Sequence, residues 1–289
     1  MKNAIALGTF DGVHIGHKAV LNLPDDCFKI AVTFNLPPKA IFSGETELIT
    51  DLEDKCRILK ELGIDEVFVL DFLEVKDLSG SDFLEFLKEK FNPSFISCGY
   101  DYRFGKGGEL SVKDLKAFCE KEGIIFRETS EVSKGGKKVS SSLIREMLKK
   151  GDFKGANRLL SEDFSFETEV ISGDKRGRTI GFPTVNQIYP ENLLKLEFGV
   201  YETRVSFDNK IYKGITNIGI RPTFKSNFII SETYIDDFSG DLYGKKLRIT
   251  PIRFIRKEVK FSSIEELKKQ IDLDLMNIKE SKNGCKKEK

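Results

Sequence analysis

In the first half of the chain, two hydrophobic periods alternate. Short apolar runs typical of buried strands stand between segments whose apolar residues recur every three or four positions, which is typical of amphipathic helices. The expected strands are 3–7, 28–34, 64–70, 94–98 and 124–127, and the expected helices are 52–62, 81–91 and 110–122. Ser81 is the expected N-cap of the second of these helices, and Gly63 follows the first as a C-cap. This alternation predicts βαβ units, with a parallel sheet covered by helices on both faces.

The helical period disappears near residue 160. A helical pattern over 143–160 is interrupted around Gly151, and alternating residues with turn signals then predict strands over 164–171, 199–207, 210–218, 229–236 and 246–254. These segments indicate a small antiparallel β-barrel. A final amphipathic helix over 261–278 begins with Ser262 or Ser263 as its cap, and the lysine-rich end reads as a frayed tail. We expect domains over 1–158 and 159–282, with a flexible tail over 283–289.

Composition narrows the class of protein. The 289 residues are enough for two cores, and 39% hydrophobic with 32% charged residues is typical of a globular chain. A net charge of +1 provides no general attraction to nucleic acid or anionic membranes, and no apolar run approaches the ~20 residues of a membrane span. Five cysteines without CxxC spacing predict reduced thiols. We expect a cytoplasmic protein without nucleic-acid, membrane or obligate protein partners.

Both histidines of the chain lie in one motif, GTFDGVHIGH, over residues 8–17. The motif falls between an expected strand and the helical pattern that begins at Lys18, so free backbone N–H groups and the helix dipole favour an anion there. His14 and His17 can donate hydrogen bonds to a triphosphate and stabilise charge at phosphorus. The alternatives are a turn with two surface histidines, or metal ligation, for which further ligands are missing nearby. HxGH resembles the nucleotidyltransferase signature, which implies a Rossmann-like fold and release of pyrophosphate.

Two further motifs of the first half suit a nucleotide and a flat ring. Residues 98–108, CGYDYRFGKGG, combine aromatics that can stack with Arg103, which can pair with a phosphate. Residues 139–145, VSSSLIR, place three hydroxyls at a helix start with Arg145 in the first turn. The plainer interpretations are an ordinary glycine-rich loop and a serine N-cap beside a surface arginine.

The second half carries its own phosphate-binding pattern. Residues 173–186, GDKRGRTIGFPTVN, hold three glycines and three basic residues before an extended segment. Thr184 and Asn186 alternate there, so both can face one ligand and offer Mg²⁺ hard oxygen donors. Glu232, on an expected strand, can accept a hydroxyl proton. A basic hairpin loop and a solvated strand glutamate are the alternatives.

Seven motifs in order resemble the family of bacterial bifunctional riboflavin kinases and FAD synthetases, from residue 4 to about residue 278. They are GTFDGVHIGH, GYDYRFG, SSSLIR, GRTIGFPTVN, NIGIRPTF, SETYIDDFSGDLYGKKL and FIRKEVKF. The resemblance implies a Rossmann-like nucleotidyltransferase domain followed by a β-barrel riboflavin kinase domain. The barrel would phosphorylate riboflavin from ATP with Mg²⁺, and the first domain would transfer AMP onto FMN to form FAD.

The resemblance also implies residue roles. Catalytic roles fall to Glu232, His14 and His17. ATP in the adenylyltransferase would contact Gly8, Thr9, Phe10, Asp11, Gly16, Ser140, Ser141 and Arg145. The flavin there would contact Asn35, Asp101, Tyr102 and Arg103. ATP in the kinase would contact Gly173, Lys175, Arg178, Gly181, Thr184 and Asn186, the last two also binding Mg²⁺.

The chain departs from the family pattern in its first domain. Asn-Leu-Pro-Pro at 35–38 replaces a Glu-Pro-His-Pro-like run, the loop after Gly105 lacks a second arginine, and Ser142 stands where threonine is usual. These changes leave open a riboflavin kinase with an impaired, regulatory flavin-binding N-terminal domain. A class I aminoacyl-tRNA synthetase would share HIGH at 14–17 but need a KMSKS loop, which is absent. Another adenylyl- or cytidylyltransferase would explain only the first half.

Overall fold

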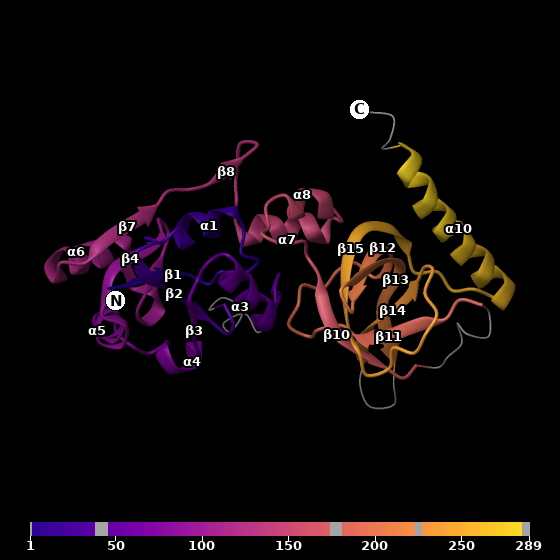
Figure 1. Cartoon of the computed structure of the whole chain (residues 1–289), viewed down its shortest axis with the longest axis horizontal. Coiled ribbons are helices and arrows are strands. Elements are labelled where there is room, and N and C mark those ends of the chain that lie inside the picture. Colours follow the sequence, from indigo (N-terminus) through magenta and orange to yellow (C-terminus); the bar gives the residue numbers. More distant parts are fainter. Residues whose placement is uncertain (1, 38–45, 174–180, 223–226, 285–289) are drawn as a thin grey trace. The chain divides into compact units, whose positions relative to one another are not determined.

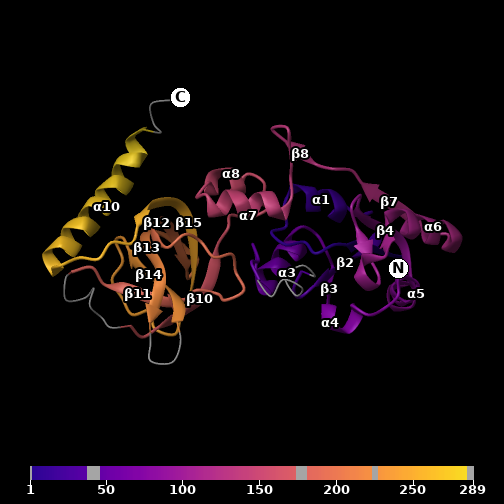
Figure 2. The same cartoon turned by 180° about the vertical axis from the view of Figure 1, so that it is seen from behind.

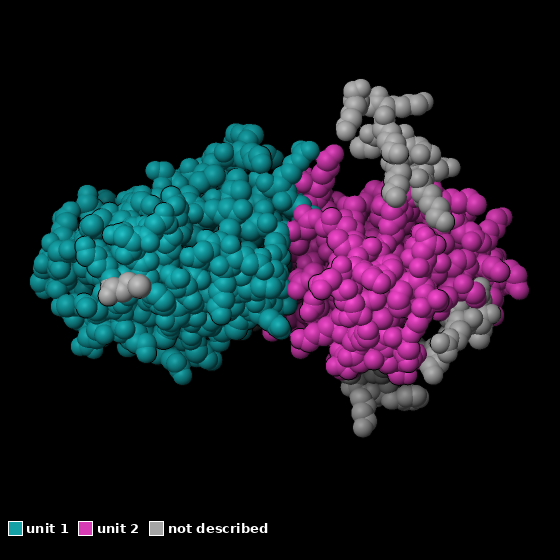
Figure 3. Space-filling model, viewed as in Figure 1, with its two compact units in different colours: residues 1–146, 156–162 teal, residues 147–155, 163–289 magenta. Residues whose placement is uncertain are grey.

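The computed structural model describes residues 2–37, 46–173, 181–222 and 227–284. The chain forms two compact units, shown in different colours in Figure 3. Unit 1 comprises Met1–Glu146 and Ala156–Glu162, and unit 2 comprises Met147–Gly155 and Asp163–Lys289. The chain therefore passes into unit 2 at residue 147, returns to unit 1 over residues 156–162, and then remains in unit 2.

Unit 1 is built on a five-stranded parallel sheet in the order β3-β2-β1-β4-β7. Its strands are β1 (Lys2–Leu7), β2 (Cys27–Phe34), β3 (Glu66–Leu70), β4 (Pro93–Gly99) and β7 (Ile125–Thr129). The strands predicted from the apolar runs are thereby confirmed. Because all five run the same way, the loops that follow them gather at one edge of the sheet.

Helices cover both faces of this sheet, as the alternation predicted (Figure 1). Ile5 and Leu7 of β1 pack with α5 (Gly80–Phe91) and α6 (Val112–Glu122), whereas Ala4 and Ala6 pack with α1 (Ile15–Leu21) and α3 (Leu52–Glu61). This division follows from the period of two along a strand, which sends successive side chains to opposite faces.

The structure corrects the start of two helices. Ser79, not Ser81, is the N-cap of α5, because its hydroxyl accepts a hydrogen bond from the Asp82 N–H at 3.1 Å. The helix expected from residue 110 begins at Val112, since Leu110–Ser111 forms β6 and pairs with β5 (Arg103–Phe104). The short α4 (Phe72–Val75) and 3₁₀ helix η1 (Lys106–Gly108), like β8 (Ser133–Lys134) and β9 (Lys137–Lys138), were not expected, because such short elements show no hydrophobic period.

The segment after residue 156 completes the turn that holds the histidines. The pattern expected over 143–160 is split into α7 (Ser141–Lys149) and α8 (Phe153–Asn157), with Gly151 between them at φ 76°. The N–H of Ile15 then donates to the carbonyl of Leu159 at 2.9 Å, and that of Ser161 to the carbonyl of Val13 at 3.1 Å. These bonds explain why 156–162 belongs to unit 1.

Unit 2 contains a closed antiparallel barrel in the order β10-β11-β14-β13-β12-β15. Its strands are β10 (Phe166–Ile171), β11 (Thr184–Ile188), β12 (Gly199–Phe207), β13 (Lys210–Pro222), β14 (Asn227–Ile235) and β15 (Lys246–Lys257). A chain of buried hydroxyls crosses its interior, from Thr203 to Thr216 and on to Thr233, with 2.9 Å between successive oxygens. The predicted barrel is confirmed, and this polar chain marks which strand residues face inward.

Helix α10 (Ile264–Gly284) lies along the barrel in both cartoons (Figures 1 and 2). Ser263 caps it by accepting the Glu266 N–H at 3.2 Å, and Ile278 packs against Val200 and Ile215 of the barrel. Arg256 of β15 forms an ion pair with the buried Asp274 at 2.8 Å. The helix continues past its predicted end, and of the predicted tail only residues 285–289 lie outside the described residues.

Candidate functional site

A pocket of about 910 Å³ opens at the carboxyl ends of the parallel strands of unit 1. Its lining includes the turn after β1, Phe34 at the end of β2 and Pro37 after it, the loop after β4, and the start of α7. The sequence predicted that these loops meet, and the structure confirms that they line one pocket. Strand ends in parallel sheets are where such folds bind their ligands.

Most of the residues predicted for the adenylyl transfer line this pocket. They are Gly8, Thr9, Phe10, Asp11, His14, Gly16, His17, Asp101, Tyr102, Arg103, Ser140, Ser141 and Arg145. Asn35 does not line it; its side-chain oxygen accepts a hydrogen bond from the Leu36 N–H at 2.7 Å. A flavin-binding role of Asn35 stays a prediction.

The two histidines cap each other at the start of α1. The Nδ1 atom of His14 accepts a hydrogen bond from the backbone N–H of His17, and Nδ1 of His17 accepts one from the backbone N–H of His14, both at 3.3 Å. The rings are stacked, with centroids 3.6 Å apart. Because each Nδ1 is an acceptor, the proton of each neutral imidazole lies on Nε2. The turn thus presents two N–H donors of fixed tautomer.

Burial keeps both imidazoles neutral. It lowers the pKa of His14 from 6.5 to about 4. It also lowers the pKa of His17 well below 6.5, and the positive charges of protonated His14 and of Lys55 add to this effect. Near pH 7 the rings therefore donate hydrogen bonds without carrying positive charge. As for the metal-ligation alternative, the described residues contain no group of three or more His, Cys, Asp or Glu that could hold a metal ion.

Asp11 joins the segments around the pocket. Its carboxylate accepts the backbone N–H groups of Ile49 at 2.9 Å and Thr50 at 3.3 Å, and it forms an ion pair with Arg145 of α7. Arg145 also donates from Nε to the carbonyl of Glu47 at 2.7 Å. Burial raises the pKa of Asp11, and the Arg145 charge and the two N–H groups oppose this rise. Arg145, expected to contact ATP, lines the pocket while it is paired with Asp11.

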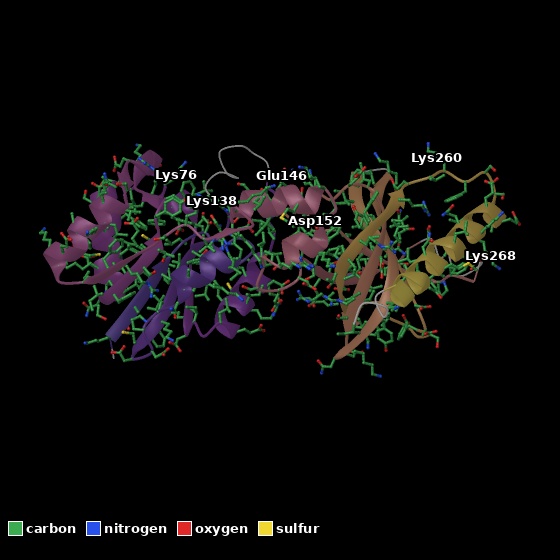
Figure 4. All side chains as sticks on the ribbon, turned by 90° about the horizontal axis from the view of Figure 1, so that it is seen from above. Lys76, Lys138, Glu146, Asp152, Lys260 and Lys268 are labelled. Carbon is green, nitrogen blue, oxygen red and sulfur yellow. The ribbon has the colours of Figure 1, made fainter. Side chains whose placement is uncertain are left out.

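Two lysines near the pocket were missed by the sequence analysis. Lys55 is only 3% exposed, and its ammonium donates to the carbonyls of Phe34 at 2.6 Å and Thr9 at 3.4 Å. Lys138 of β9, labelled in Figure 4, pairs with Asp101 at 2.9 Å, and its ammonium lies 4.7 Å from the ring centre of Tyr100. Lys55 sits on an amphipathic helix, where a lysine usually faces water, so its pattern carried no signal. The position of Lys138 directly before the VSSS run was the one available signal.

The residues predicted for the kinase reaction lie in a row that crosses three strands of the barrel. Asn186 of β11 lies opposite Glu232 of β14, and Glu232 lies opposite Asn217 of β13. Directly opposed residues point to the same face, and neighbours along a strand point to the other. Since Thr233 and Thr216 face the interior, the row lies on the outer face of the barrel, where Thr184 also belongs.

Asn186 is held against Gly173. Its side chain is 7% exposed, and a Cβ atom at Gly173 would lie 2.3 Å from its Nδ2 atom, so only glycine fits there. Its Oδ1 atom is buried and has no hydrogen-bond partner among the described residues. Gly181 has φ +85°, and the predicted Lys175 and Arg178 lie outside the described residues.

Comparison with known proteins extends over both units. The FAD synthetase family model matches residues 1–143, and the riboflavin kinase model matches residues 160–282. A bifunctional riboflavin kinase/FMN adenylyltransferase of Listeria monocytogenes is 33% identical, with 95% of this chain and 90% of that protein covered. Proteins with the same description from Bacillus subtilis and Escherichia coli K12 are 34% and 32% identical, with 94% and 96% of this chain and 90% and 91% of theirs covered.

A crystal structure shares the fold over nearly the whole chain. It is described as a macrolide-efflux protein from Streptococcus pneumoniae, is 28% identical, and superposes with a TM-score of 0.84 over 95% of this chain and 93% of that one. Among the described residues of the present chain, no helix is long and apolar enough to cross a membrane.

The neutral histidines predict a pH-dependent stability of unit 1. In the unfolded chain His14 binds a proton near pH 6.5, whereas in the folded chain it does so only near pH 4. The unfolded state is therefore increasingly favoured as the pH falls from about 6.5 to about 4. We expect the free energy of unfolding to fall, relative to that of a His14→Gln/His17→Gln variant, by on the order of 3 kcal/mol across this pH range. Urea unfolding at several pH values measures this difference. Parallel pH curves for the two proteins would contradict it, since all other titrating groups are shared.

Proposed function

The chain belongs to the family of bifunctional riboflavin kinase/FMN adenylyltransferases, and from this premise we propose which domain carries out which reaction. It is a transferase that phosphorylates riboflavin to FMN and adenylylates FMN to FAD. We assign the adenylyl transfer to residues 1–158 and the phosphorylation to residues 159–282. The observation that carries the assignment is the separation of the two residue sets: both histidines line the pocket of unit 1, and Glu232 lies on the barrel of unit 2.

In the adenylyl transfer, a phosphate oxygen of FMN attacks the α-phosphorus of ATP. A new P–O bond forms to the FMN phosphate, and the bond between the α-phosphorus and the bridging oxygen breaks as pyrophosphate leaves. The attacking group is already anionic near pH 7, so alignment and charge neutralisation matter more than a base. The Nε2–H groups of His14 and His17, with the backbone N–H groups of their turn, supply donors for the phosphates.

The charges that line the pocket support a divalent cation as a companion of ATP. The charged lining residues are the cations Lys76, Arg103, Lys138 and Arg145 and the anions Asp11, Glu47, Asp101 and Glu131. The positive and negative charges of these side chains are equal in number, and the neutral histidines add none. Mg²⁺ bound to the triphosphate would offset the negative charge that this lining leaves uncompensated.

In the kinase reaction, Glu232 takes the proton of the riboflavin 5′-hydroxyl. The alcohol oxygen then attacks the γ-phosphorus of ATP, and ADP leaves with the electrons of the broken P–O bond. Thr184 and Asn186 would hold Mg²⁺, and the buried, unpartnered Oδ1 atom of Asn186 fits that role because it is a hard oxygen donor. When bound, the ion would neutralise charge on the ATP phosphates.

The same evidence bears on the alternative of an inactive first domain. The pocket is lined by all eight residues predicted to contact ATP there, which supports a working adenylyltransferase. We further propose a cytoplasmic enzyme, because the cysteines among the described residues, Cys27, Cys56, Cys98 and Cys119, form no disulfide. Purified protein incubated with riboflavin, ATP and Mg²⁺ should form both FMN and FAD on chromatography. FMN alone would support the impaired-domain alternative.

The histidine pair should serve only FAD formation. In the His14→Ala/His17→Ala variant, FAD synthesis from added FMN should fall ~10²-fold or more, because two phosphate donors are lost. Riboflavin phosphorylation should be nearly unchanged, since the barrel has its own residues for it. Both half-reactions are measured on the same preparation. Persistent FAD synthesis would overturn the histidine roles, and equal loss of both activities would indicate one shared site.

Glu232 should be needed only for FMN formation. Glu232→Gln keeps the shape of the side chain but removes the base, so phosphorylation of riboflavin should drop ~10²-fold or more. Conversion of added FMN to FAD should continue. Glu167→Gln is a matched control, because Glu167 of β10 pairs with Arg248 at 3.2 Å and β10 is not a neighbour of β14 in the barrel. A normal kinase rate in Glu232→Gln would remove Glu232 from the mechanism.

Thr184 should act through Mg²⁺-ATP. Thr184→Val replaces an oxygen donor by a methyl group of similar volume, so kinase activity should fall ~10- to 100-fold while FAD synthesis from FMN persists. The apparent affinity for Mg²⁺ in the kinase assay should weaken, whereas the KM for riboflavin should change little. Near-normal activity at saturating Mg²⁺-ATP would show that another group holds the metal.

A further inference from the structure

The row of residues on the outer face of the barrel includes one residue, Asn217, to which no role has been assigned above. Asn217 lies directly opposite Glu232 on β13, on the side away from Asn186. Glu232 is therefore flanked by two asparagines in register, with about 5 Å between the Cβ atoms of directly opposed residues. A side chain placed next to the proposed base can contact the same substrate.

Asn217 presents a buried acceptor that the protein does not use. Its Nδ2 atom donates to Oε1 of Glu258 at 3.0 Å, which fixes the orientation of the amide. The Oδ1 atom on the other side of the amide is buried, and it has no hydrogen-bond partner among the described residues. A buried carbonyl oxygen without a partner lowers stability, so its retention calls for an explanation such as a bound donor.

Glu258 is placed to keep this orientation. Its carboxylate lies over Gly219, where an added Cβ atom would come within 2.1 Å of Oε1. Gly219 and Asn217 are two residues apart on β13 and share the outer face. The missing side chain at position 219 thus makes room for the carboxylate that holds the amide.

The two ends of the row suit different parts of the reactants. At one end, Asn186 lies against Gly173 at the start of the glycine-rich loop, which suits ATP phosphates and their metal ion. At the other end, Asn217 lies opposite Val200, which packs with α10. This end suits the sugar-alcohol chain of riboflavin, whose hydroxyls are hydrogen-bond donors.

We propose that Asn217 is a substrate-positioning residue of the kinase, whose Oδ1 atom accepts a hydrogen bond from the ribityl 4′-hydroxyl, next to the hydroxyl that is phosphorylated. Glu232 and Asn217 then hold neighbouring hydroxyls, so that the reacting oxygen faces the phosphates at the Asn186 end. The inference rests on the proposed role of Glu232. It makes the kinase selective for an alcohol with a neighbouring hydroxyl.

The test compares two flavins on two proteins. With riboflavin, Asn217→Ala should lower kcat/KM by ~10- to 100-fold, because a hydrogen bond to the substrate is lost. With 4′-deoxyriboflavin, which lacks the proposed donor, wild type should lose a similar factor, and Asn217→Ala should cost less than ~3-fold more. Equal loss with both flavins would overturn the proposal.

Two measurements separate this role from metal binding and from misfolding. The Mg²⁺ concentration for half-maximal kinase rate should be unchanged in Asn217→Ala, and a large increase would make Asn217 a metal ligand instead. Glu258→Ala, which frees the amide without altering Asn217, should show a smaller loss with riboflavin and almost none with the deoxy analogue. Glu167→Ala removes a carboxylate on β10, which is not a neighbour of β13 or β14, and should leave both rates unchanged. If Glu258→Ala matched Glu167→Ala, the positioning device would be excluded.

Failure of this inference can be told from failure of the proposed function. If Glu232→Gln leaves the kinase rate intact, the assignment of the base itself is wrong. If Glu232→Gln abolishes phosphorylation but Asn217→Ala retains full kcat/KM for riboflavin, the base stands and the role of Asn217 is refuted.

Discussion

The architecture of unit 1 depends on one buried carboxylate. Asp11 is 2% exposed, and through it the turn after β1 is joined to the segment at 47–50 and to α7. Burying a charge is costly unless partners replace its water, and here two backbone N–H groups and Arg145 do so. The Ser141 hydroxyl reinforces the junction by donating to the Asp11 carbonyl at 2.9 Å. The segments that must meet around a nucleotide are therefore held together before any ligand arrives.

The same turn shows how a strained backbone is stabilised by its surroundings. Phe10 and Val13 have φ values of 48° and 35°, which residues other than glycine adopt rarely. Both are fully buried, and Val13 accepts the Ser161 N–H. The histidines at its end cap each other, so their ring orientation follows from the backbone of the turn. Such a pocket, with neutral imidazoles and balanced charges, presents oriented hydrogen-bond donors rather than a net positive charge.

The sequence predicted the elements well, because both halves have clear hydrophobic periods, and it located the HxGH turn between β1 and α1. It could not predict which polar side chains bind other groups of the protein. Arg145, expected to contact ATP, is also paired with Asp11, and Lys55 resembled a surface residue but is buried on backbone carbonyls. Asn217 was missed for a related reason: its proximity to Glu232 is a matter of strand register between β13 and β14, which no local spacing encodes.

Strand register determines which side chains lie together on the barrel, and in this respect the barrel differs from the pocket of unit 1. There, glycines and a helix start present backbone donors, whereas on the barrel the groups proposed to act are side chains aligned across β11, β14 and β13. A slip of one residue in any of these strands would turn Glu232 or an asparagine toward the interior. The buried hydroxyl chain of Thr203, Thr216 and Thr233 opposes such a slip, because each hydroxyl would lose its partner in a closed core. The polar interior of the barrel thus fixes the alignment of the reactive groups outside it.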